Sequence, residues 1–341
     1  MYNVQVSVLR KVFLALLCNS ILEVVSAPPA PTVRTVAPAL TKRSIGDSSQ
    51  CWANCAPPPY VRRKMLAASS LFSLAMRVPG GYEVPAGCVT ALSNGALFNA
   101  SAVLPAKEGC GAAGVASPSI QIYAADVHFK SDVPLTSFTA DWVVPPLPAS
   151  HPFGGSQVVY FWPGFKAQQP EMGYPVLQPV LQYGERGRNW ALQSWFVDAK
   201  DPRFPVVTAP AVAVQPGDKL TSFMSLSSDG TTWTVSGTNK NSGEDSTLHI
   251  AYSRAGKTDY DNAMLVNENI NVDEHCDRMP ASSGVTFTNV TVNGKSPTWV
   301  TRANCAGNPE CDCGNAANVD PATGDVTLSW KTSVVVEAAV A

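Results

Sequence analysis

Two segments of the chain place groups capable of acid–base chemistry in the alternation of a β-strand. In residues 176–183, alternation puts Leu177 and Leu181 on one face and Gln178 and Gln182 on the other. The apolar face is expected to be core, so the two glutamines would line the opposite surface, where an open sandwich offers a groove. The simpler alternative is that both are solvated residues of an exposed sheet face.

A carboxylate occupies the second segment, residues 263–272. Alternation there puts Glu268 on the same side as Met264, Val266 and Ile270. A carboxyl group among such neighbours is partly desolvated, which favours its protonated form and makes it a proton carrier at acidic pH. The alternative is a β-bulge that turns Glu268 into solvent.

Other chemistries find little support in the residues. The four His do not accompany a Gly-x-Ser-x-Gly elbow, a His-Glu-x-x-His motif is absent, and none of the Cys pairs has zinc spacing with a His nearby. We therefore expect neither a metal nor a cofactor. A net charge of −2 with 15% charged residues gives no basic field for nucleic acid or anionic membranes.

The elements that must position these groups are predicted to be strands. Runs of β-branched and aromatic residues alternate with turn signals, and no amphipathic helix separates them, which predicts an all-β antiparallel sandwich or jelly roll over residues 119–341. The runs cover residues 120–129, 137–144, 157–162, 176–183, 190–197, 206–214, 219–226, 231–238, 246–251, 263–272, 285–292 and 326–330.

The N-terminal residues predict that the protein is exported from the cell. Arg10 and Lys11 precede an apolar stretch that ends in small residues, so residues 1–27 are interpreted as a signal peptide of a secreted protein. Residues 28–43, rich in Pro and Ala and ending in Lys42-Arg43, are interpreted as a disordered pro-segment or linker. Residues 44–118 form a Cys-containing extension with a helix over 60–76. It is expected to be retained on the sandwich, the alternative being a second pro-region that shields a site until it is cut.

The cysteine count agrees with export. Of nine Cys, Cys18 lies in the predicted signal, and an oxidising compartment favours disulfides among the rest. These are Cys51, Cys55, Cys88, Cys110, Cys276, Cys305, Cys311 and Cys313. Sequence alone does not choose their pairing, although a Cys276–Cys305 bridge would staple neighbouring strands. Sequons at Asn99 and Asn289 predict N-glycosylation.

The order of several short motifs resembles the glutamic peptidases called eqolisins, over about residues 119–295. The motifs are 138–145, Phe161-Trp-Pro-Gly-Phe-Lys166, Leu177-Gln178, 195–198, 215–218 and Asn262-Ala-Met264. The resemblance implies a concanavalin A-like double sheet and a secreted acid endopeptidase without cofactor.

The same resemblance puts Gln178 on the glutamine of the family's Gln/Glu dyad. Met264 stands at the position of the family's glutamate, and Lys166 at that of an aspartate. Glu268 lies four residues further on, which keeps it on the same face but displaced by about 13 Å. The resemblance therefore implies a shifted dyad of Glu268 with Gln182, or with Gln178, if the two strands are neighbours.

In such a dyad, Glu268 would act as general base on a water that attacks a peptide carbonyl, and then as general acid to the leaving amine. The glutamine amide would donate to the tetrahedral oxyanion. Trp162 and Trp195 could form apolar walls for substrate, although tryptophan in a sandwich is more often core.

Two classes of function therefore remain open. The first is an acid endopeptidase with a polypeptide substrate, acting as a monomer and free of the membrane after processing. The alternative is a non-catalytic, lectin-like carbohydrate-binding module on the same fold, with a glycan as partner. A glycoside hydrolase ranks lowest, because no strand with suitably paired carboxylates is visible.

Overall fold

The computed structural model describes residues 75–80, 82–99, 124–151, 157–167, 175–184, 187–198, 206–251, 260–272, 275–302 and 313–332. Contacts divide the chain into Met1–Pro58 and Pro59–Ala341, and every described residue lies in the second unit. The predicted signal peptide, the pro-segment and Cys51, Cys55, Cys110, Cys305 and Cys311 lie outside the described residues.

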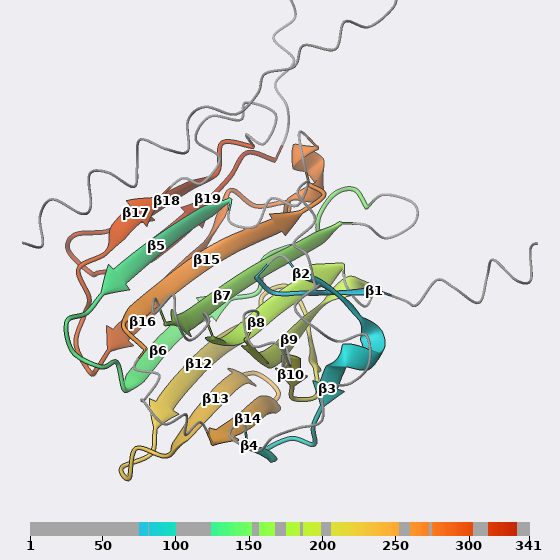
Figure 1. The fold of residues 1–341 in the computed structure, drawn as a ribbon. Coiled ribbons are helices and arrows are strands. Elements are labelled where there is room, and N and C mark those ends of the chain that lie inside the picture. Colours follow the sequence, from blue (N-terminus) through green and yellow to red (C-terminus); the bar gives the residue numbers. More distant parts are fainter. Residues whose placement is uncertain are drawn as a thin grey trace, which may run out of the picture. The chain divides into compact units, whose positions relative to one another are not determined.

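Two sheets form the β-sandwich (Figure 1). The larger has the order β17 (Val300–Arg302), β5 (Ala125–Lys130), β15 (Asn262–Ile270), β7 (Val158–Lys166), β8 (Val176–Gly184), β9 (Gly187–Val197), β10 (Val206–Thr208) and β3 (Val89–Ala91), with β11 (Val212–Val214) also paired to β9. The smaller has the order β18 (Ala316–Val319), β19 (Val326–Ser329), β16 (Gly284–Val292), β6 (Ser137–Val143), β12 (Lys219–Leu226), β13 (Thr232–Asn239), β14 (Asp245–Ala251) and β4 (Leu97–Asn99).

The predicted all-β sandwich is confirmed, and each predicted run overlaps a strand. The run 206–214 is divided into β10 and β11, because Pro210 lacks the N–H that a continuous ladder needs. The prediction that all strand pairs are antiparallel is wrong for two pairs, because β3 pairs with β10 and β4 with β14 in parallel. Both strands come from the segment that the sequence assigned to the N-terminal extension.

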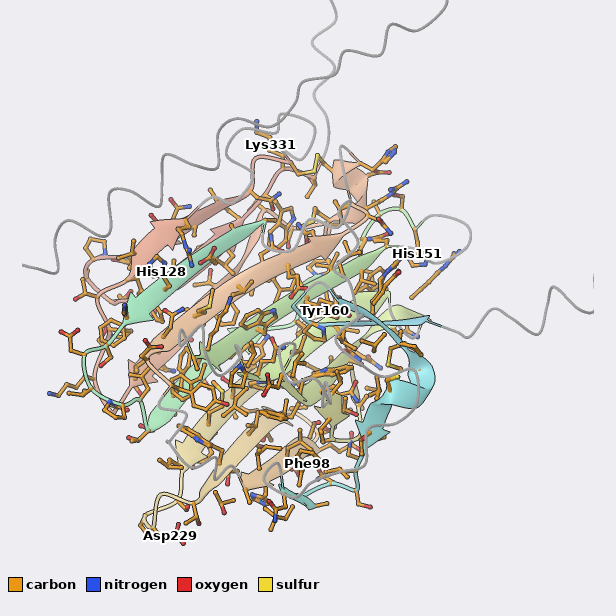
Figure 2. The ribbon with its side chains drawn as sticks, viewed as in Figure 1. Phe98, His128, His151, Tyr160, Asp229 and Lys331 are labelled. Carbon is orange, nitrogen blue, oxygen red and sulfur yellow. A yellow bond between two sulfur atoms is a disulfide. The ribbon has the colours of Figure 1, made fainter. Side chains whose placement is uncertain are left out.

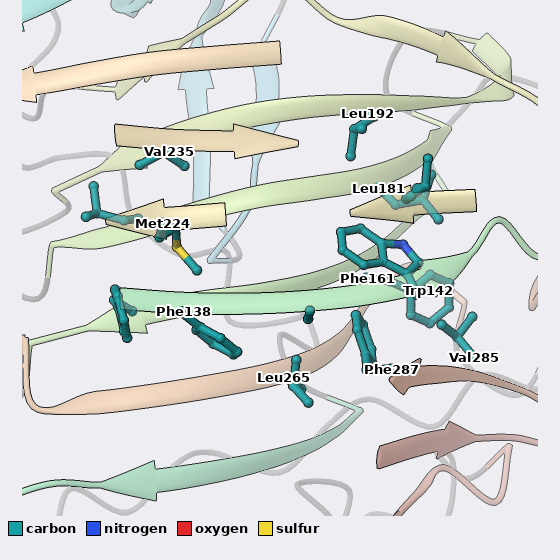
Figure 3. Packing of buried hydrophobic residues seen from close by; sticks show 14 of the residues in the cluster. Phe138, Trp142, Phe161, Leu181, Leu192, Met224, Val235, Leu265, Val285 and Phe287 are labelled. Carbon is teal, nitrogen blue, oxygen red and sulfur yellow. The ribbon is translucent and has the colours of Figure 1, made fainter. Parts of the chain in front are cut away.

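The inner faces of the two sheets form the main core (Figure 3). Phe138 and Trp142 of β6 meet Phe165 of β7 and Phe287 of β16, with ring centroids 5.5 Å apart for Phe138–Phe165 and 5.3 Å for Trp142–Phe287. Burial of each such side chain contributes roughly 1.5–3 kcal/mol, which makes this layer the main source of cohesion.

The middle of the larger sheet is buried on both faces, unlike the smaller sheet. β13 alternates between partly and fully buried residues, whereas β8 and β15 are buried throughout. Their outer face belongs to a second apolar group, here called the outer-face cluster: Val78, Val84, Cys88, Val158, Tyr160, Trp162, Val176, Val180, Trp195, Val197, Val206, Met264, Val266 and Ile270.

Part of that cover is a short hairpin of β1 (Ala75–Val78) and β2 (Tyr82–Pro85), which crosses the larger sheet at β7 and β8 (Figure 1). Two short 3-10 helices, Ala86–Cys88 and Cys276–Arg278, complete the described elements. The helix predicted over residues 60–76 lies mostly outside the described residues, and its last two positions, Ala75 and Met76, belong to β1 instead. Packing of β1 on the sheet overrides their helical preference.

A disulfide joins Cys276 to Cys313, with a Cα–Cα distance of 5.3 Å. Cys276 therefore does not pair with Cys305, because Cys313, three residues before β18, occupies the position beside it. Cys88 is also disulfide-bonded. Among the described residues, no helix is long and apolar enough to cross a membrane.

The Cys276–Cys313 bridge closes a sequence separation of 37 residues. Replacing both residues by Ser should lower the free energy of unfolding by about 4 kcal/mol, because the unfolded chain regains the entropy of that loop. Denaturant unfolding without reductant measures the loss against the unmodified chain. A loss below about 1 kcal/mol would contradict a stabilising role for this bridge.

Candidate functional site

Glu268 lies on the outer face of β15 and is fully buried. The backbone N–H of Gly80 donates to both of its carboxylate oxygens, at 2.9 Å to Oε1 and 3.1 Å to Oε2. Trp162 Nε1–H donates to Oε2 at 3.1 Å. The side chain is therefore not turned into solvent, and its polar atoms are held by named donors.

Trp162 reaches Glu268 because of the residue two places further along β7. Trp162 and Gly164 share the outer face, and a Cβ at Gly164 would come within 2.8 Å of the Trp162 ring. Only glycine leaves space for the indole to lie over its own strand. Since Trp162 pairs with Val266 of β15, its Nε1 lies beside the strand that carries Glu268.

Gly80 occupies the turn of the β1–β2 hairpin, with φ of 97°. Most residues are strained at such a positive φ, and glycine is not. Val78 and Val84 are 0% and 1% exposed and join the outer-face cluster. Their burial holds the turn over β15, where the Gly80 N–H meets the carboxylate.

Tyr160 lies between Glu268 and Gln182 in the register of three neighbouring strands, β15, β7 and β8. Its ring belongs to the outer-face cluster, and its hydroxyl donates to the backbone carbonyl of Arg77 at 3.1 Å. Figure 2 shows Tyr160 beside the hairpin. Tyr160 and Glu268 thus hold a carbonyl and an N–H of one backbone segment.

The two predicted glutamines are on the outer face and are buried, but neither is bonded to Glu268. Gln182 donates from Nε2 to Gln193 Oε1 at 2.9 Å, and Gln193 donates to the Ala209 carbonyl at 2.7 Å. Gln178 is 0% exposed, and neither of its amide atoms has a hydrogen-bond partner in the described part of the chain.

Register separates the two candidate dyads. Gln182 and Glu268 lie in one row with a single strand between them, about 10 Å apart at the backbone. Gln178 lies in the row of Gly164 and Met264, so it is a further 13 Å or so along the strands from Glu268. Trp195, opposite Gln178 on β9, is fully buried in the same cluster.

Charged groups extend the outer face towards β5 and β17. His128 pairs with Met264, and its Nδ1 lies 4.0 Å from Asp126 Oδ2, which Arg302 Nη2 approaches at 3.3 Å. Burial lowers the pKa of His128, and Arg302 adds to this, while Asp126 opposes it. Nowhere in the described ranges do three His, Cys, Asp or Glu side chains gather as a metal site requires.

The two sequons lie on the smaller sheet. Asn99 is exposed at the end of β4. Asn289 is exposed on β16, where the pairing with β6 shifts register, and its Nδ2 donates to Asp141 Oδ2 at 3.0 Å.

Solved structures of glutamic peptidases are similar to this chain in fold. A scytalido-glutamic peptidase with a transition state analog inhibitor matches with 16% identity and a TM-score of 0.43, over 62% of this chain and 98% of that one. A member of the eqolisin family in a complex with the tripeptide Ala-Ile-His matches with 16% identity and a TM-score of 0.42, over the same shares.

Aspergilloglutamic peptidase from Aspergillus niger matches with 18% identity and a TM-score of 0.33, over 51% of this chain and 98% of that one. No protein-family model and no curated protein matches the sequence. At these identities the likeness concerns the fold alone.

Sequence reasoning found the face and the burial of Glu268 but missed Tyr160, Gly80 and Arg77. Tyr160 carries a signal, because it alternates with Trp162 and Gly164 and must share their face. The sequence Pro-Gly-Gly at positions 79–81 is a recognisable turn signal. That it meets a residue 188 positions away is visible only in the fold.

Replacing Trp162 by Phe should lower the free energy of unfolding at neutral pH by about 1–3 kcal/mol more than replacing Trp195 by Phe. The first change removes a donor to a buried carboxylate. The second removes an Nε1–H that has no hydrogen-bond partner among the described residues. Denaturant unfolding of both variants measures the difference, and equal losses would contradict the Trp162–Glu268 bond.

Replacing Gln182 and Gln178 by Met, which has a shape similar to that of Gln, should have opposite effects on stability. Gln182→Met breaks the bond to Gln193 and should cost about 1–2 kcal/mol, because the Gln193 acceptor stays buried. Gln178→Met removes an unsatisfied amide and should leave stability unchanged or raise it by up to about 1 kcal/mol. A larger loss of thermal stability for Gln178→Met than for Gln182→Met would contradict this prediction.

Proposed function

We propose that the protein is a secreted acid endopeptidase of the glutamic type, with Glu268 as its proton carrier. The observation that supports this most is the fully buried Glu268 carboxylate, which accepts a backbone N–H from a hairpin lying on the outer face of the larger sheet. A carboxylate that binds a peptide N–H supports a role in peptide chemistry, and the attacking water would enter together with the substrate.

In the proposed reaction, Glu268 takes a proton from a water molecule as the water oxygen bonds to the peptide carbonyl carbon. The proton then passes to the leaving nitrogen as the C–N bond breaks. An amide N–H of Gln182 is the candidate donor to the oxyanion, because Gln182 lies in the row of Glu268. Gln178 is the less favoured candidate, because of its distance along the strands.

The β1–β2 hairpin lies over Glu268, so a polypeptide substrate can reach the carboxylate only when the hairpin moves away. Trp162 and Trp195 would then form apolar walls of the opened site. Secretion is supported by the signal-like N-terminus, the disulfide and the exposed sequon residues Asn99 and Asn289. We further propose a monomer that is free of the membrane after processing.

The lectin-like alternative gains no support on this face. Sugar rings stack on exposed aromatic side chains, whereas Trp162 and Trp195 are both 0% exposed. Glycan screening is therefore the second experiment and follows a negative result of the first.

The first experiment is cleavage of an acid-unfolded protein across about pH 2–6. It uses the purified chain and a variant in which two glycines replace residues 76–84. Cleavage is expected, stronger in the variant, and Glu268→Gln should reduce the rate at least about 100-fold because it removes the proton carrier. Gln182→Ala and Gln178→Ala identify the oxyanion donor by which of them loses activity.

The folded state of each protein is checked by circular dichroism. Cleavage that survives Glu268→Gln, or no cleavage by either folded form at any pH, would contradict the proposed function.

A further inference from the structure

The backbone of the hairpin is bound by side chains of the sheet beneath it. Tyr160 donates to the Arg77 carbonyl, and Glu268 accepts from the Gly80 N–H. Within the described part of the chain, β1 and β2 pair only with each other. These contacts involve atoms that every peptide has, so they do not depend on the side chains of the hairpin.

We infer that the outer face of β7 and β15 is a binding site for peptides with an apolar-Pro-Gly turn, and that the chain's own β1–β2 hairpin is its resident ligand. The inference rests on the proposed function for what happens to a bound peptide, but not for binding itself. It makes the hairpin an internal competitor for the site of Glu268.

The three turn residues define the class of ligand. Val78 is 0% exposed and packs in the outer-face cluster, so the first position must be apolar. Pro79 is buried and brings no N–H that would need a partner. Gly80 combines a positive φ with the N–H that the buried carboxylate requires. A charged residue at either of the first two positions would be buried without a counter-ion.

Tyr160 and Glu268 have complementary parts in this site. The hydroxyl of Tyr160 recognises a carbonyl and the carboxylate of Glu268 an N–H, so a bound peptide is fixed in one direction along the sheet. The two residues are paired neighbours on β7 and β15, which sets the spacing between the two recognised groups. Trp162 positions the carboxylate and does not need to touch the peptide.

The attachment of the hairpin explains why it holds the site against other peptides. β2 continues through the Ala86–Cys88 turn into β3, which is hydrogen-bonded to β10 at the edge of the larger sheet. A ligand tethered so closely acts at an effective concentration in the millimolar range. A free peptide of similar intrinsic affinity therefore binds appreciably only when the hairpin is removed.

The hairpin can be removed without straining the chain. Ala75 and Pro85 are paired across its base, so two glycines can replace residues 76–84. The probe is a synthetic fluorescent peptide with the sequence of residues 75–85, and fluorescence anisotropy measures its binding. We expect saturable binding to the hairpin-deleted chain at least about tenfold tighter than to the intact chain.

Point variants of the hairpin-deleted chain identify the binding groups. Tyr160→Phe and Glu268→Gln should each weaken binding about tenfold, as expected for loss or weakening of one buried hydrogen bond. Tyr183→Phe is the matched control, because Tyr183 is a buried tyrosine that faces the main core. A scrambled peptide of the same composition should not bind. Equal binding of the scrambled peptide, or no binding by the folded deleted chain, overturns the inference.

A second measurement uses the intact chain, in case the deleted chain does not fold. Trypsin can cut after Arg77 only when the hairpin leaves the sheet, so the rate of that cut reports opening. Tyr160→Phe should speed it about tenfold relative to Tyr183→Phe, and equal rates would overturn the inference.

The two proposals fail separately. A deleted chain that binds the peptide and cleaves nothing supports the binding site and contradicts the peptidase. A deleted chain that cleaves at acidic pH but does not bind the peptide supports the peptidase and contradicts the binding site.

Discussion

A carboxylate buried away from water must be given hydrogen-bond donors, and this requirement at Glu268 organises the outer face of the larger sheet. Trp162 supplies one donor, and it can do so because Gly164 leaves room for its ring. Gly80 supplies another, which requires a turn with positive φ and a hairpin anchored by Val78 and Val84. Without the hairpin, the carboxylate would lose one donor and would be exposed to water.

The sandwich itself explains why such a site lies on this sheet. The inner faces of both sheets are committed to the aromatic core, so chemistry can occur only on an outer face. On the larger sheet, β15, β7 and β8 are adjacent, and each carries a residue with a polar group on that face. The row of Glu268, Tyr160 and Gln182 results from this register alone. Met264 leaves the row of Gln178 without a carboxylate.

The strands and the face of Glu268 could be predicted from sequence because alternation is a local property. The hairpin could not, since its contacts join residues almost 190 positions apart and its own strands are four residues each. The parallel pairing of β3 with β10 and of β4 with β14 is likewise decided by distant parts of the chain, and so is the disulfide partner of Cys276. For Ala75 and Met76, the helical pattern of the preceding residues gave the wrong element, because tertiary packing outweighs local propensity.

The bond between the Gly80 amide and the Glu268 carboxylate is the centre of this account, and site-resolved hydrogen exchange of the full chain measures it directly. We expect the Gly80 amide to exchange at least about 100-fold more slowly than an amide in an unstructured peptide, because a buried carboxylate holds it. Exchange at the unstructured rate, in a protein whose β7 and β15 amides remain protected, would contradict the account.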